Sequence, residues 1–416
     1  MKEKGFTLIE LLAVIVILAI IALIATPIIL GIIKDSKKES DKRSIEMYAD
    51  ALKNSIAQYQ LGGEKLEVST LETTDGRNFI NKEDFKVDYD GDVVCKTIEV
   101  YEDGNIYLAE CEVNGNEVKY TYGKRQETLA QYITNLYNNS TTKTNSLEVD
   151  GITYSLDTTN GLMDDRLGGT VESGGNIRYY GKTPNNYIDI GDKDASGNVI
   201  LWRIIGVFKD IDVTDENGNV IKTEDLVKII RADSIGTMAW DSGKINNWST
   251  ATLNKYLNTS TYYPSLNSDV TSKIENVKWN ISSSSYGSAV FANDFYVNER
   301  ATETKIWSGK VALMYPSDYG YGADLGKCNK APYNYSRTAS CIATDWLLDS
   351  SLTQWTLNPN SSSSYYVFCV FSSGYVVYSH AYYTDFGVRP ALYLKSDVSI
   401  VGEGTTVTGI KYYVVE

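Results

Sequence analysis

Histidine is nearly absent from this sequence, and cysteine is scarce. His380 is the only histidine among 416 residues, and there are five cysteines. Because most zinc sites and many proton relays use histidine, chemistry that needs several of them is hard to build here. Positive charge is also short, with 39 Lys and Arg against 53 Asp and Glu and a formal net charge of −14. That field repels polyanions such as DNA, so we expect no nucleic-acid partner.

Apolar residues, by contrast, are sufficient for folded domains. Hydrophobic residues make up 43% of the chain and charged residues 22%, a balance that argues against wholesale disorder. The length predicts about three domains. Tyrosine is the dominant aromatic residue, with 32 Tyr against 9 Phe.

The longest apolar segment runs over residues 6–33, and Glu10 is its only charged residue. A helix of this length, at ~1.5 Å per residue, is ~42 Å long and crosses the ~30 Å hydrocarbon layer of a membrane. In a secretory signal peptide the apolar stretch is shorter and precedes a small-residue cleavage site, whereas here Gly5 comes before it. A simple anchor would lack Glu10, because an unpaired carboxylate among apolar residues costs several kcal/mol.

Residues 4–12, Lys-Gly-Phe-Thr-Leu-Ile-Glu-Leu-Leu, resemble the processing and methylation motif of type IV prepilins. The resemblance implies cleavage between Gly5 and Phe6 by a prepilin peptidase, which also N-methylates Phe6. It further implies that Glu10 guides assembly by pairing with the N-terminus of an adjacent pilin subunit. Pro27 lies where pilin helices commonly carry a bending proline. An unprocessed anchor and a signal peptide remain the alternatives.

We expect the helix to continue beyond the membrane as an amphipathic segment over residues 34–62. Apolar residues recur there at spacings of 3, 4, 4 and 3: Ile45, Tyr48, Leu52, Ile56 and Tyr59. One stripe of this kind packs against a sheet. The glycines at 62 and 63 end the helix.

Residues 64–137 predict a small antiparallel pilin-type sheet followed by a second helix over 126–137. A hairpin centred on Asp103 pairs residues whose numbers sum to 206, which places Cys95 opposite Cys111. A disulfide between these cysteines and a pair of buried thiols both satisfy that register.

Two of the remaining cysteines, Cys328 and Cys341, lie 13 positions apart in a polar loop. That spacing is too wide for a Cys-x-x-Cys metal or redox pair. A disulfide closing this loop would contribute about 3 kcal/mol in the chain-entropy model. Cys369 lies in an apolar strand pattern and is expected to be a core residue. Two disulfides and one thiol suit an oxidising exterior.

The C-terminal part begins after a linker over residues 138–176. Its pattern starts at Trp202-Arg-Ile-Ile-Gly-Val and ends at Gly387-Val-Arg-Pro-Ala-Leu. This order resembles an uncharacterised extracytoplasmic domain family of Gram-positive-type bacteria, which is distantly similar to the C-type-lectin-like fold of formylglycine-generating enzymes. The resemblance implies a lectin-like α+β head over residues 177–416. Arg389, near its end, is expected to be structural.

No catalytic residue, cofactor or metal site is predicted in this head. Formylglycine-generating chemistry needs reactive cysteines, and Cys369, the one left over, lies among apolar residues that raise the pKa of a thiol. Residues 192–197 resemble the start of an EF-hand calcium loop, but its twelfth position is Arg203 instead of Glu. The tyrosines between residues 365 and 383 are either a binding surface or half-buried strand residues.

Together these patterns predict an α+β chain with a long membrane-spanning helix, a small sheet and a displayed head. Its expected parts are the leader 1–5, the transmembrane and assembly helix 6–33, its continuation 34–62, the β region 64–137, the linker 138–176 and the head 177–416. We expect a pilin-like subunit, minor or at the tip, of a type IV-type pilus or related filament. It would be single-pass, with its head outside the cell for adhesion to a glycan or protein.

Two other functions stay open at this stage. One is a pseudopilin of a secretion or DNA-uptake system, and the other is a surface enzyme of the formylglycine-generating type on a pilin anchor. The partners expected in the pilin case are the prepilin peptidase and methyltransferase, other pilin subunits bound through the N-terminal helix, and membrane lipid.

The first prediction concerns processing. Intact-mass spectrometry of the membrane-extracted protein should find the chain without residues 1–5 and with one added methyl group. A chain that begins at Met1 would contradict cleavage. The same spectrum recorded with and without reductant counts the disulfides.

Overall fold

The computed structural model describes residues 8–62, 69–101, 104–123, 127–166, 175–283, 290–301 and 305–416. The chain divides into two compact units, Met1–Gln126 and Glu127–Glu416, and each has its own hydrophobic core. The architecture is α+β with a long N-terminal helix and several antiparallel sheets, which confirms the expected class.

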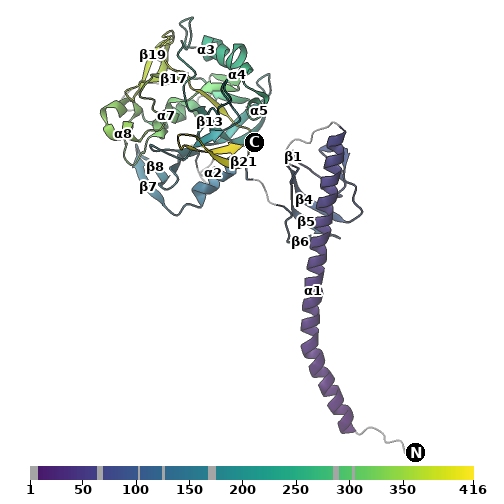
Figure 1. Cartoon of the computed structure of the whole chain (residues 1–416). Helices are drawn as coiled ribbons and strands as arrows, with labels where there is room; N and C mark the ends of the chain where they lie inside the picture. The colour runs from purple at the N-terminus through teal and green to yellow at the C-terminus, as the bar shows by residue number, and fades with distance from the viewer. Residues whose placement is uncertain are drawn as a thin grey trace, which may run out of the picture. The chain divides into compact units, whose positions relative to one another are not determined.

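The first unit is organised by one helix, α1 (Leu8–Leu61), of 54 residues. Figure 1 shows its C-terminal part lying along a small sheet while its N-terminal part extends beyond the sheet. The helix continues through Pro27, which removes one backbone donor. It ends at Gly62, whose N–H donates to the carbonyl of Tyr59 at 3.0 Å.

The predicted stripe is the face with which α1 packs on the sheet. Ile45, Tyr48 and Leu52 are fully buried, and Ile56 is nearly so. Tyr59 lies at the margin of this contact, partly buried, and its hydroxyl donates to Asp84 at 2.5 Å. Burying a large aliphatic side chain contributes about 1.5–3 kcal/mol, so the stripe holds α1 to the sheet.

The sheet of the first unit has the strand order β1-β4-β5-β6. Its strands are β1 (Ser69–Thr70), β4 (Val93–Val100), β5 (Ile106–Val113) and β6 (Asn116–Val118), and a separate hairpin is formed by β2 (Asn78–Phe79) and β3 (Lys82–Lys86). The predicted register of β4 and β5 is confirmed, because every pair from Val93 with Val113 to Val100 with Ile106 sums to 206. Cys95 therefore lies opposite Cys111.

The start of the second unit differs from the expected boundaries. Helix α2 (Leu129–Asn138) belongs to this unit and not to the pilin-type sheet. The stretch expected as a linker forms three strands, β7 (Lys143–Val149), β8 (Ile152–Asp157) and β9 (Leu162–Asp164), which join the large sheet of the head. The abundance of Asn, Ser and Thr suggested a loop, but Leu156 in β8 is nearly inaccessible to solvent.

The chain enters the second unit beside its own C-terminal end. A capping box starts α2, in which Thr128 and Gln131 exchange side-chain and backbone hydrogen bonds of 3.3 and 3.2 Å. The N–H of Leu129 donates to the carbonyl of Val398 at 2.8 Å, and Thr128 forms a bridge with Ser399. Residues about 270 positions apart in the sequence are thereby joined.

The large sheet of the head has the order β16-β20-β13-β12-β10-β9-β8-β7. Its further strands are β10 (Ile177–Tyr179), β12 (Trp202–Thr214), β13 (Val220–Arg231), β16 (Val311–Leu313) and β20 (Pro390–Tyr393). Strands β12 and β13 form a long hairpin, with Trp202 opposite Arg231. The strands β11 (Tyr187–Asp189), β14 (Val277–Asn280), β15 (Ile306–Gly309), β21 (Ile400–Thr405) and β22 (Lys411–Val415) attach beside this path.

A second sheet of three strands and a set of short helices complete the head. The sheet contains β17 (Gln354–Pro359), β18 (Tyr366–Val370) and β19 (Val376–His380). The helical segments are η1 (Trp248–Thr250), α3 (Thr252–Lys255), the π-helix η2 (Tyr256–Ser260), α4 (Tyr262–Ser265), α5 (Ser268–Thr271), α6 (Ala292–Ala301), α7 (Pro316–Gly322), η3 (Pro332–Arg337) and α8 (Ala339–Thr344).

The stripe on α1 gives the second prediction. Leu52→Ala should lower the unfolding free energy of the first unit by about 2–5 kcal/mol, because it leaves a cavity under the helix. Met47→Ala, on the exposed face of the same helix, should change it by less than about 0.5 kcal/mol. All seven tryptophans lie in the second unit. For Leu52→Ala, the urea transition followed by tryptophan fluorescence should therefore stay unchanged, while the transition followed by far-UV circular dichroism shifts to lower urea. Equal effects of Leu52→Ala and Met47→Ala would refute this packing.

Candidate functional site

The N-terminal part of α1 is an exposed apolar surface. Among the described residues, α1 is the one helix long and apolar enough to cross a membrane. Leu8 is 83% exposed and Leu23 78%, and most large apolar side chains up to Ile33 are more than half exposed. A continuous apolar surface of this extent marks a site that contacts either membrane lipid or other proteins.

Three residues at this end, Gly5, Phe6 and Glu10, were predicted to take part in processing and assembly. Gly5 and Phe6 are outside the described residues. Glu10 is within the first turns of α1, but its side chain is outside the described part. Cleavage, N-methylation and the pairing of Glu10 with a neighbouring subunit therefore stay predictions.

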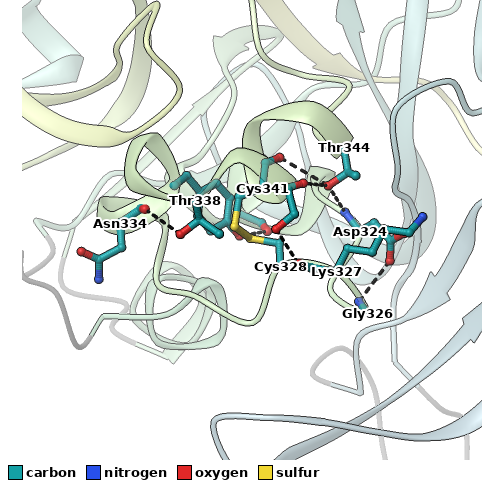
Figure 2. Close-up of a disulfide and its surroundings, with 11 residues drawn as sticks. Asp324, Gly326, Lys327, Cys328, Asn334, Thr338, Cys341 and Thr344 are labelled. Atoms are coloured by element: carbon teal, nitrogen blue, oxygen red, sulfur yellow. Dashed lines mark hydrogen bonds and ion pairs between the residues drawn. A yellow bond between two sulfur atoms is a disulfide. The ribbon is translucent and has the colours of Figure 1, made fainter.

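Both predicted disulfides are present. Cys95 joins Cys111 across β4 and β5, and Cys328 joins Cys341 in the head. Figure 2 shows the second bond, which links α8 to the turn at residues 324–328, ahead of η3. Beside it, the hydroxyl of Ser340 donates to the carbonyl of Lys327 at 2.8 Å.

The fifth cysteine, Cys369, is a free thiol in the middle of β18. It is fully buried and donates to the carbonyl of Val377 at 3.4 Å. Burial raises the pKa of this thiol well above its ordinary value. A protonated and inaccessible sulfur is a poor nucleophile, as the sequence suggested.

A group of charged residues lies inside the head, between the large sheet and helices α6 and α7. Arg178 on β10 binds two carboxylates, donating from Nε to Asp165 and from Nη1 to Asp318 at 3.1 Å. Lys228 on β13 donates to the second oxygen of Asp318 at 2.5 Å. All four side chains are at most 1% exposed. Buried charges in such number require close pairing, which they have here.

A third carboxyl group, that of Glu299 on α6, joins this buried ionic cluster. Its two oxygens accept hydrogen bonds from the N–H and hydroxyl of Ser317. Burial, and then the charge of Asp318, raises the pKa of Glu299 to about 8. With Glu299 protonated, the cluster balances two cations, Arg178 and Lys228, against two carboxylates.

The arginines singled out by the sequence are also structural. Arg389 is buried and donates to the carbonyls of Arg231 and Leu347 at 2.9 and 3.1 Å. Arg203 is buried with its guanidinium 4.3 Å from the ring centroid of Trp346. Burial lowers the pKa of both to about 10, so they remain charged at neutral pH.

The EF-hand-like stretch forms a turn. One carboxylate oxygen of Asp194 accepts from the N–H groups of Ser196 and Asn198 at 2.8 and 2.9 Å. These bonds lower the pKa of Asp194, led by the hydrogen bonds from Asn198. Across the described residues, no group of three His, Cys, Asp or Glu side chains is arranged to hold a metal ion.

Aromatic side chains gather around the single histidine at the end of β18 and β19. The ring of His380 stacks on Tyr365 at 5.3 Å and lies 5.0 Å from Tyr382 and 5.5 Å from Tyr383. These three tyrosines are 36–41% exposed. We call this group the His380 aromatic patch. The other tyrosines of this stretch, Tyr366, Tyr375 and Tyr378, are partly buried, so a binding role for the exposed ones stays a prediction.

Family comparison assigns two parts of the chain. Residues 1–26 match the family model described as the prokaryotic N-terminal methylation motif. Residues 220–396 match the model of a domain of unknown function, DUF6273. No curated protein and no solved structure matches the chain.

The motif and the exposed helix define the class of the N-terminal part. It is type IV prepilin-like, and the motif supports processing by prepilin peptidase and assembly with other pilins. The helix and the motif fit a single-pass membrane anchor. For the head, the matched family carries no assigned activity, and no comparison links it to C-type-lectin-like or formylglycine-generating proteins.

Glu299 gives the third prediction. Its pKa is about 8 in the folded state and 4.5 ordinarily, so between these values the folded chain holds a proton that the unfolded chain releases. The stabilisation is complete below about pH 4.5 and is lost as the pH rises through about 8. Glu299→Gln should remove this fall, on the order of a few kcal/mol.

Tryptophan fluorescence in urea, recorded from pH 5 to 9, measures the effect in the head alone. Glu148→Gln, on the exposed side of β7, is the control and should keep the wild-type pH dependence. Parallel pH profiles for wild type and Glu299→Gln would mean that Glu299 is ionised throughout.

Proposed function

We propose that this chain is a minor or tip subunit of a type IV-type pilus or a related filament, which displays its head outside the cell. The observation that carries the proposal is the continuity of α1 (Leu8–Leu61). One helix joins an apolar segment, which has no packing partner among the described residues, to a segment packed on a sheet. Such a helix can lie in a membrane before assembly and among equivalent helices afterwards.

Glu10 gives this packing its register. A carboxylate among apolar side chains is costly unless it finds a positive partner. Cleavage after Gly5 would free an amine at Phe6, four residues before Glu10, and the same amine on a neighbouring subunit supplies the charge. Pairing of this kind fixes the axial offset between two helices, because both groups lie at defined heights along them.

The size of the head favours a minor or tip position. Removal of residues 1–5 leaves 411 residues, and the second unit, Glu127–Glu416, holds most of them. A bulky head in every subunit would crowd the surface of a thin filament. The His380 aromatic patch supports a role in binding, since exposed tyrosines offer contact area at a low cost in conformational entropy.

We further propose that the head does not act as an enzyme. Of the five cysteines in the chain, four form disulfides and the fifth, Cys369, is buried. The buried ionic cluster is engaged internally, because both oxygens of Glu299 bind Ser317. A distant relation of the head to the C-type-lectin-like fold stays part of this proposal, supported by the order of its first and last strand motifs.

Substitution of Glu10 tests the assembly role and is the fourth prediction. Glu10→Val should leave processing and membrane level unchanged and lower the amount in sheared filaments by at least about tenfold, because one ion pair per interface is lost. Glu39→Val, further along α1 and exposed, is the control and should assemble normally.

Immunoblots of the sheared and membrane fractions measure both quantities. Normal incorporation of Glu10→Val would refute the pairing. Absence of the wild-type chain from filaments, with a secretion or DNA-uptake defect on deletion, would refute the pilus role and establish the pseudopilin alternative.

A further inference from the structure

A cleft of about 830 Å³ opens on the head, away from the disulfide and the His380 aromatic patch. Its walls come from four places: the turn between β12 and β13, the helical stretch from Ser249 to Tyr263, the start of β14, and strand β15 with Lys310 after it. Most of these residues lie within the matched segment 220–396. The volume is sufficient for two or three small rings.

One wall of this cleft is a fixed aromatic ring. Trp307, partly buried on β15, packs edge-to-face on Trp248 at 5.9 Å, and Trp248 packs on Trp240 at 5.3 Å. Both inner tryptophans are fully buried. Gly309 is required beneath the ring, because a Cβ there would lie 2.1 Å from a ring carbon of Trp307. The ring is thus held in place before any ligand arrives, which lowers the entropic cost of binding.

Another part of the lining is polar and is also held in place by hydrogen bonds. The π-helix η2 places Asn258 at the cleft. The amide of Asn258 donates to the carbonyl of Val311 at 2.8 Å and accepts from its N–H at 3.0 Å. Short π-helical segments of this kind occur frequently at functional sites. Ser249, Thr259 and Ser308 add hydroxyl groups to the lining.

The cleft is positively charged in a chain that is negative as a whole. Three lysines line it, and Glu216 is the one acidic residue among its lining side chains. Lys310 binds Glu216 at 3.0 Å, and Lys278 binds Asp212, which is outside the lining, at 3.0 Å. Lys255 has no ion-pair partner among the described residues. Burial lowers the pKa of Lys310, but the hydrogen bonds and charges of Glu216 and Tyr263 together raise this pKa above its ordinary value, so Lys310 stays protonated.

We propose that this cleft binds an acidic saccharide, with one sugar ring against Trp307 and its anionic group beside Lys255. The apolar C–H face of a pyranose fits a rigid aromatic ring, its hydroxyls fit the amides and hydroxyls, and its charge fits the lysine excess. A neutral saccharide would leave Lys255 unused, and a polyphosphate would leave Trp307 unused. The proposal rests on the proposed outward display of the head and deepens it by giving the ligand class.

The test uses the full-length chain in nanodiscs of uncharged lipid. The probes are trigalacturonate and its methyl ester, sialyllactose and lactose, mannose 6-phosphate and mannose, and tripolyphosphate. At least one acidic saccharide should bind at least about tenfold more tightly than its neutral counterpart and than tripolyphosphate, as measured by isothermal titration calorimetry.

Two variants assign that binding to the cleft. Lys255→Glu should weaken it by at least about tenfold through charge, and Gly309→Ala should weaken it by displacing the ring of Trp307. Lys193→Glu, an exposed lysine elsewhere on the head, and Tyr382→Ala in the His380 aromatic patch are the controls and should bind as wild type. Unfolding followed by tryptophan fluorescence verifies that each variant is folded.

The proposal is overturned if no acidic saccharide of the set binds, if a neutral counterpart or tripolyphosphate binds as tightly, or if only Tyr382→Ala loses binding. Calorimetry is independent of filament assembly. Saccharide binding by a chain that never enters filaments would therefore refute the pilus role and leave the cleft assignment standing.

Discussion

The contact between α1 and the small sheet is the interaction on which the first unit depends. Along α1 the apolar side chains are exposed up to Ile33, and they are buried against the sheet from Ile45 through Tyr48 to Leu52. Upstream of them the apolar side chains face every direction, and downstream they face one direction only. A single element therefore connects a membrane environment to a water-soluble sheet without a hinge of its own between them, and whatever fixes the helix also fixes the sheet.

The first unit could largely be predicted from the sequence because its signals are local. The stripe from Ile45 to Ile56 follows helical spacing, and the register of Cys95 with Cys111 follows from one turn. The prepilin-like motif is equally local, since it is a run of adjacent residues near the N-terminus.

The head was predicted less completely because its stability depends on residues far apart in the sequence. The strands β7 to β9 were expected as a linker, since a polar composition hides the few apolar residues that pack. The buried ionic cluster was not anticipated. One signal was available: Lys228 interrupts the apolar run from Leu226 to Ile230 in β13, and a lysine at such a position needs a buried carboxylate. Its partner Asp318, 90 positions away, has no distinguishing mark in the sequence.

The position at which the chain joins the head has a mechanical consequence. In the proposed function, tension between the anchored helix α1 and a ligand on the head enters the second unit at Thr128 and Leu129. These residues are bonded to Ser399 and Val398, beside the last two strands. Such a force is shared between helix α2 and the segment that leads into β21 and β22, instead of being carried by α2 alone.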